Sequence, residues 1–284
     1  MICAATTAVP KLSLAKKTWR ASLDLEISTA NGKSVVSKSS QNGPLTIQSP
    51  FYPEDGVCHL YLLHPPAGLV GGDELELSIA AQQQSSVLLT TPGATKFYKT
   101  NGEIASQNQR VRISDGSSLE LLPQETIYYP DTNASLSTTV YLEGSGNYLG
   151  WELHCFGLPA RGDSLGAGTV RVGMSVFRNN NLILRDAAVI NEKKKKFQAV
   201  FMRDWPVYGS FLMTGGSERL LETLRNKVLE GHQICGATLV EDLLIIRYLG
   251  SSVLQARNIF LKAWQIARPL ILGKLPVPPR IWQT

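Results

Sequence analysis

The sequence lacks several features that would place it quickly in a class. It has no uninterrupted apolar run of about 18 residues, which would indicate a membrane-spanning helix, and no basic residue ahead of its apolar N-terminal start, unlike a secretory signal. Its four cysteines lie far apart and form no C-x-x-C pair, which is usual in a reducing compartment. We therefore expect a cytoplasmic protein that does not associate with membranes.

Nucleotide and nucleic-acid binding are also disfavoured. The stretch NGKS, residues 31–34, resembles the end of a phosphate-binding P-loop, but Ile27 stands where that loop needs a glycine. The net charge is only +5, and much of the excess lies in the lysine run 193–196, where no aromatic residue alternates with the lysines. We interpret this run as a solvated turn and expect no nucleic-acid partner.

Strand patterns dominate the chain. Several segments alternate apolar with polar residues, as on a strand with one buried face, and others are continuously apolar, as on a strand buried on both faces. The alternating segments are 18–27, 73–79, 109–114 and 134–142, and the apolar segments are 57–63 and 85–91. Turn residues separate them, and we find no internal repeat. We predict a mainly β fold with layered, sandwich-like sheets, consisting of a short flexible leader at 1–16 and one domain at 17–284.

Only two segments have a helical pattern, and both lie near the C-terminus. Ser217 can cap the first helix, and Ser251 or Ser252 can cap a second helix that ends before Pro269. Between them, the apolar segment 241–249 predicts a buried strand. We therefore expect about two α-helices in an otherwise β-rich chain.

A stiff loop precedes one of the predicted strands. The segment HPPAGLVGGDELEL, residues 64–77, places two prolines and three glycines ahead of a clear strand pattern. The prolines fix φ and remove two backbone donors, so they cannot lie in a sheet ladder. The glycines permit positive φ or the close approach of another segment. Such a loop suits a phosphate cradle, a metal gate or a protein-docking surface.

Possible metal donors are scattered along the chain. The adjacent pairs at 58–59 (Cys-His) and 154–155 (His-Cys) each offer at most one ligand to a given site, because neighbours on a strand point to opposite faces. A closed zinc site is therefore disfavoured, whereas a transient site needs only two or three donors. The candidate donors for a transient site are His64, Asp73, Glu74, Glu125 and Glu152. Each carboxylate can equally be a strand-end solvent contact or half of an ion pair.

No catalytic arrangement is evident. The tetrapeptide GDSL, residues 162–165, carries the nucleophile in one esterase family, but the Asp that this family needs shortly before a late histidine is missing. A glycine-rich turn accounts for the tetrapeptide better. The loops 90–100 and 121–130 carry aromatic residues beside charged ones, as protein interfaces do, although such residues can also anchor a core. From the residues alone we predict a binding scaffold and no enzyme.

Five separated motifs, in the expected order, point to a known family. They are HPPAGLVGGDELEL, LLTTPGATKFYKTNG, LELLPQETIYYP, WELHCFGLPARGDSLGAG and PVPPRIWQT. With these motifs the chain resembles the urease accessory protein family called UreD or UreH. The resemblance extends from about Trp19 to Thr284, nearly the whole chain.

The resemblance implies a non-enzymatic chaperone for the assembly of the urease metal centre. Members of the family bind apo-urease and recruit a helical partner, UreF, which in turn recruits a GTPase, UreG. Nickel reaches the urease active site when that GTPase hydrolyses GTP. The missing P-loop agrees with this arrangement, because GTP hydrolysis belongs to the partner. The resemblance thus implies no stably bound cofactor, with nickel(II) only in transit.

Two sets of residues follow from this interpretation. Nickel would pass weak, successive donors that bind and release it, supplied by His64, Asp73, Glu74, Glu125 and Glu152. The segment 252–284 would dock the UreF-like partner through Arg257, Phe260, Trp264, Arg280, Ile281 and Trp282, of which the last two are also expected to pack on the domain. The alternative that stays open is a stand-alone β-sandwich module that binds peptide or carbohydrate.

Overall fold

A computed structural model of the chain describes residues 19–82, 84–191, 205–231 and 234–283, and these residues form two large β-sheets and two α-helices. The strands of the seven-stranded sheet are β1 Arg20–Ala30, β2 Lys33–Asn42, β5 Glu74–Ala81, β8 Ala105–Ile113, β11 Asn133–Leu142, β13 Thr169–Arg178 and β14 Asn181–Ile190. Those of the ten-stranded sheet are β3 Thr46–Ile47, β4 Val57–Leu63, β6 Ser86–Thr90, β7 Thr95–Phe97, β9 Ser118–Leu121, β10 Thr126–Tyr128, β12 Asn147–Phe156, β15 Val207–Met213, β16 Cys235–Val240 and β17 Leu243–Gly250. The helical elements are η1 Pro159–Arg161, α2 Glu218–Leu224, η3 Arg225–Leu229, α3 Val253–Leu272 and η4 Arg280–Gln283.

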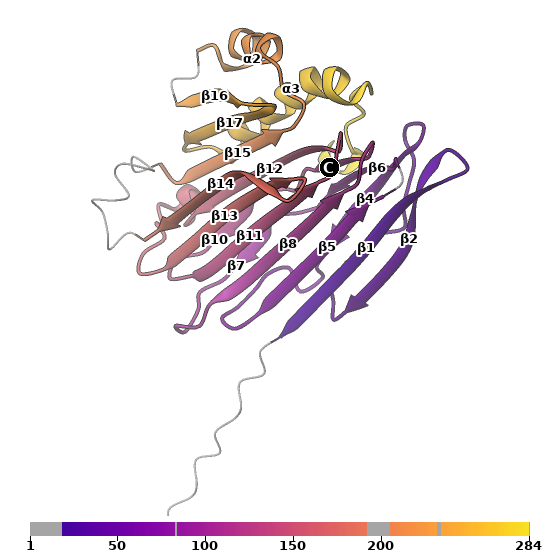
Figure 1. Cartoon of the computed structure of the whole chain (residues 1–284). Helices are drawn as coiled ribbons and strands as arrows, with labels where there is room; N and C mark the ends of the chain where they lie inside the picture. The colour runs from indigo at the N-terminus through magenta and orange to yellow at the C-terminus, as the bar shows by residue number, and fades with distance from the viewer. Residues whose placement is uncertain (1–18, 83, 192–204, 232–233, 284) are drawn as a thin grey trace, which may run out of the picture.

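The elements form three layers (Figure 1). The seven-stranded sheet, in the order β14-β13-β11-β8-β5-β1-β2, packs against the ten-stranded sheet, in the order β16-β17-β15-β12-β9-β6-β4-β3 with β10 and β7 attached beside β12. The two helices cover the other face of the ten-stranded sheet. The prediction of a mainly β, layered fold with two helices near the C-terminus is confirmed. The expected leader 1–16 and the lysine run 193–196 lie outside the described residues.

The central strands are parallel, because the chain coils between the two sheets. Strands β5, β6, β8, β9, β11 and β12 alternate between the seven- and ten-stranded sheets, and each of the later ones pairs in parallel with the strand one coil earlier. Ser86 pairs with Ser118, and Ser118 pairs with Asn147, so successive coils are 32 and 29 residues long. At three successive turns the amides of Ser85, Ser117 and Gly146 donate to the carbonyl oxygen three residues earlier, at 2.9–3.1 Å.

These stacked coils are a structural repeat, although the sequence contains no internal repeat that corresponds to it. The repeat left no fixed period in the sequence because the coil lengths differ. Stacking of the coils mainly requires that the positions facing the interior are apolar, and many different residues meet this requirement, so the coils need not resemble one another in sequence.

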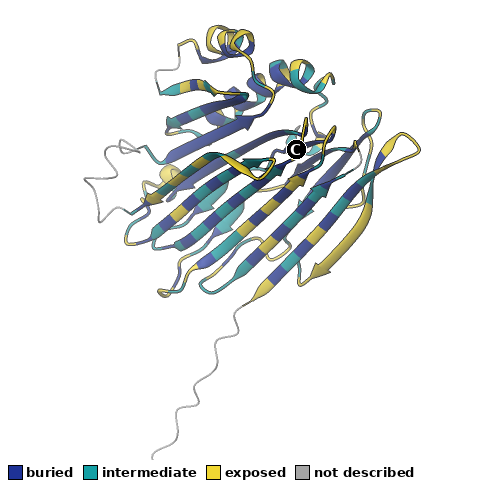
Figure 2. Ribbon diagram, viewed as in Figure 1, coloured by how far each residue is buried: buried dark blue, intermediate teal, exposed yellow. Residues whose placement is uncertain are grey.

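The space between the sheets holds the first hydrophobic core. Figure 2 shows buried and exposed residues alternating along the strands of the seven-stranded sheet, as the alternating sequence segments predicted. On β1, for example, Leu23, Leu25 and Ile27 are each at most 2% exposed. All seven predicted strand segments coincide with or overlap observed strands. The period of two in the sequence therefore located this core.

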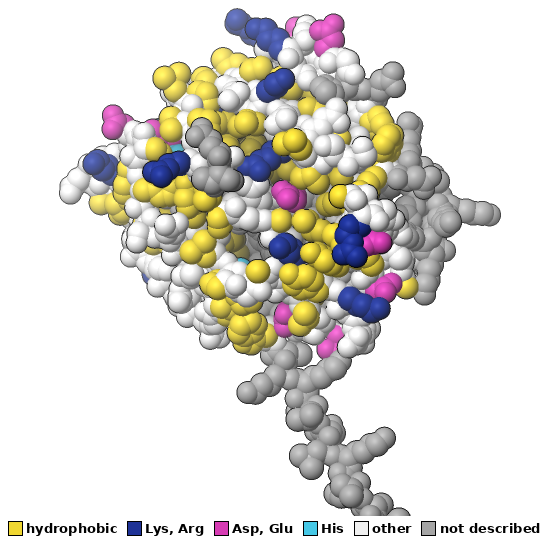
Figure 3. All heavy atoms as spheres, turned by 180° about the vertical axis from the view of Figure 1, so that it is seen from behind, with side chains coloured by type: hydrophobic (Ala, Val, Ile, Leu, Met, Phe, Trp, Pro, Cys, Tyr) yellow, Lys and Arg dark blue, Asp and Glu magenta, His cyan; other side chains and the backbone are white. Residues whose placement is uncertain are grey.

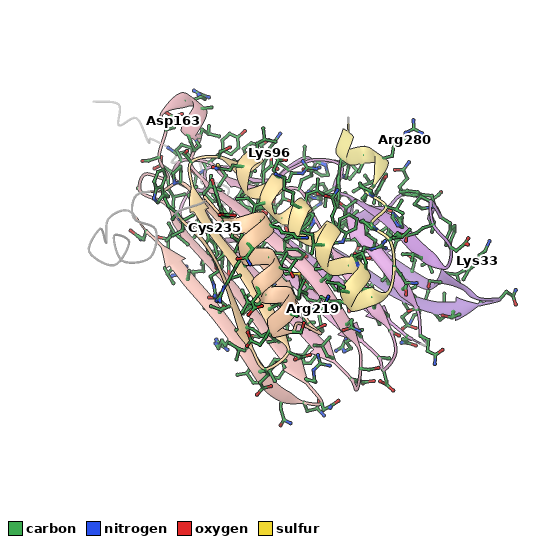
Figure 4. The ribbon with its side chains drawn as sticks, turned by 90° about the horizontal axis from the view of Figure 1, so that it is seen from above. Lys33, Lys96, Asp163, Arg219, Cys235 and Arg280 are labelled. Carbon is green, nitrogen blue, oxygen red and sulfur yellow. The ribbon has the colours of Figure 1, made fainter. Side chains whose placement is uncertain are left out.

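The two helices begin where the sequence predicts. The amide of Leu220 donates to Ser217 Oγ at 3.3 Å, and the amide of Gln255 donates to Ser252 Oγ at 3.1 Å, so each serine caps its helix. Seen from above, α2 with Arg219 and the longer α3 lie across the strands of the ten-stranded sheet (Figure 4). In the described part of the chain, no helix is both long and apolar enough to cross a membrane.

The second helix continues past Pro269, contrary to the prediction that this proline ends it. Helix α3 extends to Leu272 and closes at Gly273, whose φ is 66° and whose amide donates to the Pro269 carbonyl at 3.1 Å. A proline inside a helix removes one backbone donor and usually breaks the helix. Here the neighbouring Arg268 is anchored in the protein interior, and this anchor holds the final turn in place.

Arg268 is the centre of a buried ion cluster beneath α3. Its Nε donates to Glu120 at 2.9 Å, and its Nη2 donates to Glu54 at 2.7 Å, while Arg268 is fully buried. Glu120 also accepts from Trp264 Nε1 at 2.6 Å, and Glu54 lies 2.8 Å from His59 Nε2. Arg268 Nη1 additionally donates to the Leu275 carbonyl just after the helix. The cluster therefore fastens α3 and the start of the tail to β4 and β9.

The C-terminal tail packs against the second hydrophobic core, which lies between the ten-stranded sheet and the helices. Trp282 Nε1 donates to Thr90 Oγ1 at 2.9 Å, and the Ile281 amide donates to the Tyr61 hydroxyl at 3.4 Å. The Trp282 ring lies 5.5 Å from Trp151 and 5.8 Å from Trp264, measured between ring centroids. The prediction that Ile281 and Trp282 pack on the domain is confirmed.

Replacing Arg268 with methionine should lower the free energy of unfolding by about 3–5 kcal/mol, because Glu120 and Glu54 would stay buried without their cation. Urea denaturation followed by tryptophan fluorescence measures this loss. The matched control is Lys262→Met on the exposed face of the same helix, which should change stability by less than about 0.5 kcal/mol. Equal effects of the two substitutions would contradict the anchoring role of Arg268.

Candidate functional site

A large cavity lies between the two sheets. Its volume is about 400 Å³, and its wall is mostly apolar, with leucines contributed by both sheets. Several polar side chains interrupt this apolar wall: His64, Thr91, Lys96, Gln107, Gln109, Gln124, Thr126 and Glu152. An apolar cavity with a few convergent polar groups is the usual form of a binding site.

The proline- and glycine-rich loop forms part of this cavity. Strand β4 ends at Leu63, and the two prolines that follow stay outside any ladder, as predicted. The loop then pairs with β7, since the Leu69 amide donates to the Lys96 carbonyl and the Tyr98 amide donates to the Leu69 carbonyl, both at 2.8 Å. A Cβ on Gly68 would lie 2.9 Å from the Lys96 carbonyl oxygen, so only glycine fits there. The loop is therefore a rigid wall.

His64 brings an unused nitrogen to this cavity. Its Nε2 is buried and has no hydrogen-bond partner among the described residues. Burial lowers the pKa of His64, and the negative charge of Asp73 only partly opposes this effect. The imidazole is therefore neutral at pH 7 and can offer a lone pair to a cation.

From the cavity, a row of four side chains crosses the interior face of the seven-stranded sheet; three of them are polar and one, Met174, is apolar. Gln109 on β8 is paired in register with Thr138 on β11, Thr138 with Met174 on β13, and Met174 with Asp186 on β14. Directly paired residues share a face of the sheet, so these four side chains form one line across the strands. Neighbouring strands are about 4.8 Å apart, so the row is roughly 14 Å long.

A second polar row faces the first from the ten-stranded sheet. Glu152 on β12 pairs with Ser210 on β15, and Ser210 pairs with Arg247 on β17. The two rows are joined at two points: Thr138 Oγ1 donates to Glu152 Oε1 at 2.6 Å, and Arg247 Nη2 donates to Asp186 Oδ2 at 2.8 Å. The polar residues of both rows form what we call the polar seam, which is continuous through Glu152, Ser210 and Arg247 and is interrupted by Met174 in the first row.

Glu152 is the junction of the polar seam. It lines the large cavity, and it also lines a second cavity of about 20 Å³ that it shares with Asp186. Next to it, His154 Nε2 lies 3.4 Å from Glu152 Oε2, and His154 Nδ1 lies 3.1 Å from the Tyr128 hydroxyl. A carboxylate at this depth, with only neutral or weakly basic neighbours, is well placed to attract a cation.

The structure brings together only part of the predicted donor set. His64 and Glu152 line the same cavity. Asp73 accepts a hydrogen bond from the Val70 amide at 2.8 Å just before β5, and Glu74 forms an ion pair with Arg20 at 2.6 Å. These contacts correspond to the strand-end and ion-pair roles that the sequence had left open for each carboxylate. Glu125 is half-buried but lines neither cavity. None of these three carboxylates lines a cavity with Glu152, and a part for them in nickel passage stays a prediction.

Cys58 and Cys155 do not share a metal site. Cys58 faces the core between the sheets, whereas Cys155 faces the helices. Burial raises the pKa of each thiol to about 11, so both are protonated at neutral pH and would have to lose a proton before binding a metal. Within the described ranges, no three His, Cys, Asp or Glu side chains cluster as a closed metal site would require.

The GDSL tetrapeptide is a turn, as interpreted from the sequence. Gly162 has a φ of 75°, and its amide donates to the Pro159 carbonyl at 3.0 Å, which closes the short helix η1. Leu165, at the end of the tetrapeptide, is fully buried.

Comparison with known proteins assigns the family. A sequence model described as UreD urease accessory protein matches residues 20–283. The chain is 39% identical to the urease accessory protein UreD of Aliivibrio fischeri strain MJ11, over 97% of this chain and all of the relative. The same protein from Enterobacter sp. strain 638 and from Klebsiella aerogenes is also 39% identical, over 94% and 95% of this chain and 96% and 98% of each relative. The chain belongs to the UreD urease accessory protein family.

Membership of the UreD family gives the chain a role in urease maturation, in association with urease and other accessory proteins. The name of the family describes an accessory protein, which points to a chaperone rather than a catalyst. The resemblance drawn from the five sequence motifs is confirmed.

The predicted partner residues differ in their accessibility. Phe260 and Trp264 are fully buried in the second core, where they hold α3 on the sheet. Arg257 is half-buried, with its guanidinium 5.9 Å from the Trp282 ring centroid. Arg280 is exposed and points outward at the C-terminal turn (Figure 4). A partner contact through the six predicted residues stays a prediction.

Sequence reasoning missed most of the polar seam, although a signal for part of it was present. On β8 the inward residues Val111 and Ile113 have the same parity as Gln109, and on β11 Leu136 and Val140 have the same parity as Thr138. A polar residue at an inward position of an alternating strand marks an interior polar site. Asp186 carried no such signal, because its partner Arg247 lies 61 residues away in the sequence.

Replacing Glu152 with glutamine should change the free energy of unfolding by less than about 1 kcal/mol, because the amide oxygen can still accept the hydrogen bond from Thr138. Burying a carboxylate costs free energy, so a buried glutamate is an unfavourable choice for a position whose role is to stabilise the fold. Urea denaturation measures the difference. A loss above about 3 kcal/mol would make Glu152 a structural residue and contradict its assignment to a functional seam.

Proposed function

We propose that the chain carries nickel(II), as cargo, along the polar seam toward apo-urease while it docks the proteins of the maturation complex. The observation that carries the proposal is the continuity of the seam. It starts at a cavity that contains a free imidazole nitrogen, passes the Glu152 carboxylate and ends at the Asp186 carboxylate at the edge of the sandwich.

The chemistry of the seam suits a passing ion better than a resident one. Nickel(II) accepts imidazole nitrogen and carboxylate oxygen as ligands. Successive sites with one or two charged donors bind such an ion weakly enough to release it, as conduction requires. The hydroxyl and amide groups of Thr138, Ser210 and Gln109 can replace water around the ion between the carboxylates. The surrounding leucines lower the local dielectric and keep other polar species out.

Docking is assigned to the helix side of the molecule. Seen from behind the view of Figure 1, hydrophobic side chains cover much of the surface, and charged side chains stand singly or in small groups (Figure 3). On and after α3, Leu270 is 66% exposed and Leu275 is 77% exposed. Exposed leucines of this kind suit a helical, UreF-like partner, which would bring the UreG-like GTPase. The three described cysteines are free thiols, which supports assembly in the reducing cytoplasm.

The substitution Glu152→Gln should reduce the nickel content of urease that is co-expressed with this chain and its accessory partners. Losing the attraction of one buried charge raises the barrier to passage by at least about 1.4 kcal/mol, so nickel loading should slow roughly tenfold. Metal analysis of purified urease at limiting nickel measures the effect, and co-purification verifies that the complex still forms.

Glu74→Gln is the matched control for this experiment. Glu74 has the same side chain but pairs with Arg20 at the surface, away from both cavities, so its loss should leave nickel loading unchanged. Normal nickel content in the Glu152→Gln strain would refute conduction along the seam.

Introducing aspartate at both Leu270 and Leu275 should weaken co-purification with the UreF-like partner. A buried charge at an interface hot spot costs about 2 kcal/mol or more, which is roughly a thirtyfold loss of affinity. Pull-down from co-expressing cells measures the loss. Leu182→Asp on β14, where the leucine is 51% exposed, is the control and should not affect binding. If the double variant still binds the partner, the docking surface does not include Leu270 and Leu275.

A further inference from the structure

We propose that the ion pair between Asp186 and Arg247 is a gate at the far end of the polar seam, which a divalent cation opens by taking the place of the guanidinium group. This inference rests on the proposed conduction of nickel, and it names the residues that would control release.

The position of the pair is the first argument. Asp186 and Arg247 are the last members of the two facing polar rows, on β14 and β17. Strand β14 is the edge strand of the seven-stranded sheet, and β17 lies next to β16, the edge strand of the ten-stranded sheet. The ion pair bridges the two sheets there, at the end of the seam opposite the large cavity. Asp186 and Arg247 are the last charged groups of the seam, so an ion that follows the seam away from the cavity reaches this pair last.

The hydrogen bonds of Asp186 involve only one of its two carboxylate oxygens. Arg247 donates to Oδ2 through both Nη2, at 2.8 Å, and Nε, at 3.2 Å, and the Tyr208 hydroxyl lies 3.5 Å from the same oxygen. All three donors address one oxygen, and Oδ1 accepts no hydrogen bond from the residues that the structure describes. Burial raises the pKa of Tyr208 to about 12, with a further contribution from Asp186, so its hydroxyl stays a donor. One oxygen of Asp186 is therefore free to bind a cation while the other is held by the guanidinium.

The space beside the pair has room for about one small ion or one water molecule. The second cavity has a volume of about 20 Å³, and a cavity of about 10–15 Å³ already holds one water molecule. Glu152 and Asp186 both line it, together with Met174, Tyr208 and Ser210. A cation in this cavity would therefore lie close to both carboxylates.

The charges explain why the gate would distinguish ions. Arg247 neutralises Asp186 when the seam is empty, so the far end attracts no cation by itself. A divalent ion at Glu152 repels the guanidinium and attracts Asp186 twice as strongly as a monovalent ion at the same distance. The side chain of Arg247 is 40% exposed, so it can swing into solvent and be rehydrated there. Exchange of the guanidinium for the ion therefore favours divalent cations over sodium or potassium.

The test uses the full-length chain, co-purified with its accessory partners, and nickel(II) as the probe. Arg247→Gln removes the competing charge but keeps a side chain of similar length, so nickel measured by equilibrium dialysis should bind about tenfold more tightly than in the parent. Adding Asp186→Asn to that variant should abolish the gain. Arg247→Lys keeps the charge and should bind nickel like the parent. This variant also keeps the proposal falsifiable if the glutamine variant folds poorly.

Arg178→Gln is the matched control. Arg178 forms a similar ion pair with Asp242, also at 2.8 Å and also partly exposed, but neither residue lines the seam. Its nickel affinity should equal that of the parent. Unchanged affinity in Arg247→Gln, or an equal gain in Arg178→Gln, overturns the gate.

Nickel loading of urease separates this inference from the function on which it rests. If Glu152→Gln lowers the nickel content of urease while Arg247→Gln leaves nickel affinity unchanged, the seam conducts without this gate. If Glu152→Gln has no effect on nickel content, conduction itself fails, whatever the affinity of the Arg247 variants.

Discussion

In-register pairing of parallel strands is the constraint on which the interior of this protein depends. Because each coil repeats the path of the previous one, residues of successive coils stand beside each other, and a row of like positions runs across the sheet. A register shift of one residue would turn every side chain of a strand to the other face. The rows that carry Gln109, Thr138 and Glu152 exist only because the turns at the ends of the coils fix that register. The repeated turn hydrogen bonds are thus as important to the site as the polar residues themselves.

A polar line through a β-sandwich lowers stability, and the fold compensates for it in another layer. Burial of Glu152 opposes folding, and Asp186, whose side chain is 26% exposed, is partly shielded from water as well. The opposite face of the ten-stranded sheet carries the second core, where Trp151, Phe260 and Trp264 are almost completely buried and Arg268 ties the last helix to two strands. The helix side therefore adds stability that does not depend on the residues of the seam.

The sequence was informative wherever one residue acts on its near neighbours. Alternation located β1 and β11, serine caps located both helices, and the prolines and glycines after β4 marked a rigid loop. It was not informative where the outcome depends on distant pairing. The sequence predicted that Pro269 ends its helix. The helix continues because Arg268 is anchored by Glu54 and Glu120, and local patterns do not reveal this anchor, since the partners lie more than 140 residues away in the sequence. From the sequence, Asp73 and Glu74 looked as suitable as Glu152 for binding a metal. Only the structure distinguishes them, because it shows which groups each carboxylate contacts and which of them lines the cavity.

The buried thiols bear on the proposed passage of nickel. Cys58 faces the core between the sheets, where the polar seam also lies, and a thiolate there would hold a thiophilic ion far more tightly than oxygen ligands do. Burial raises the pKa of Cys58 to about 11, so the thiol is protonated at neutral pH and must lose a proton before it can bind a metal. This requirement disfavours capture of a passing ion by Cys58 at neutral pH. It disappears in strongly alkaline solution, where the thiolate forms without a metal.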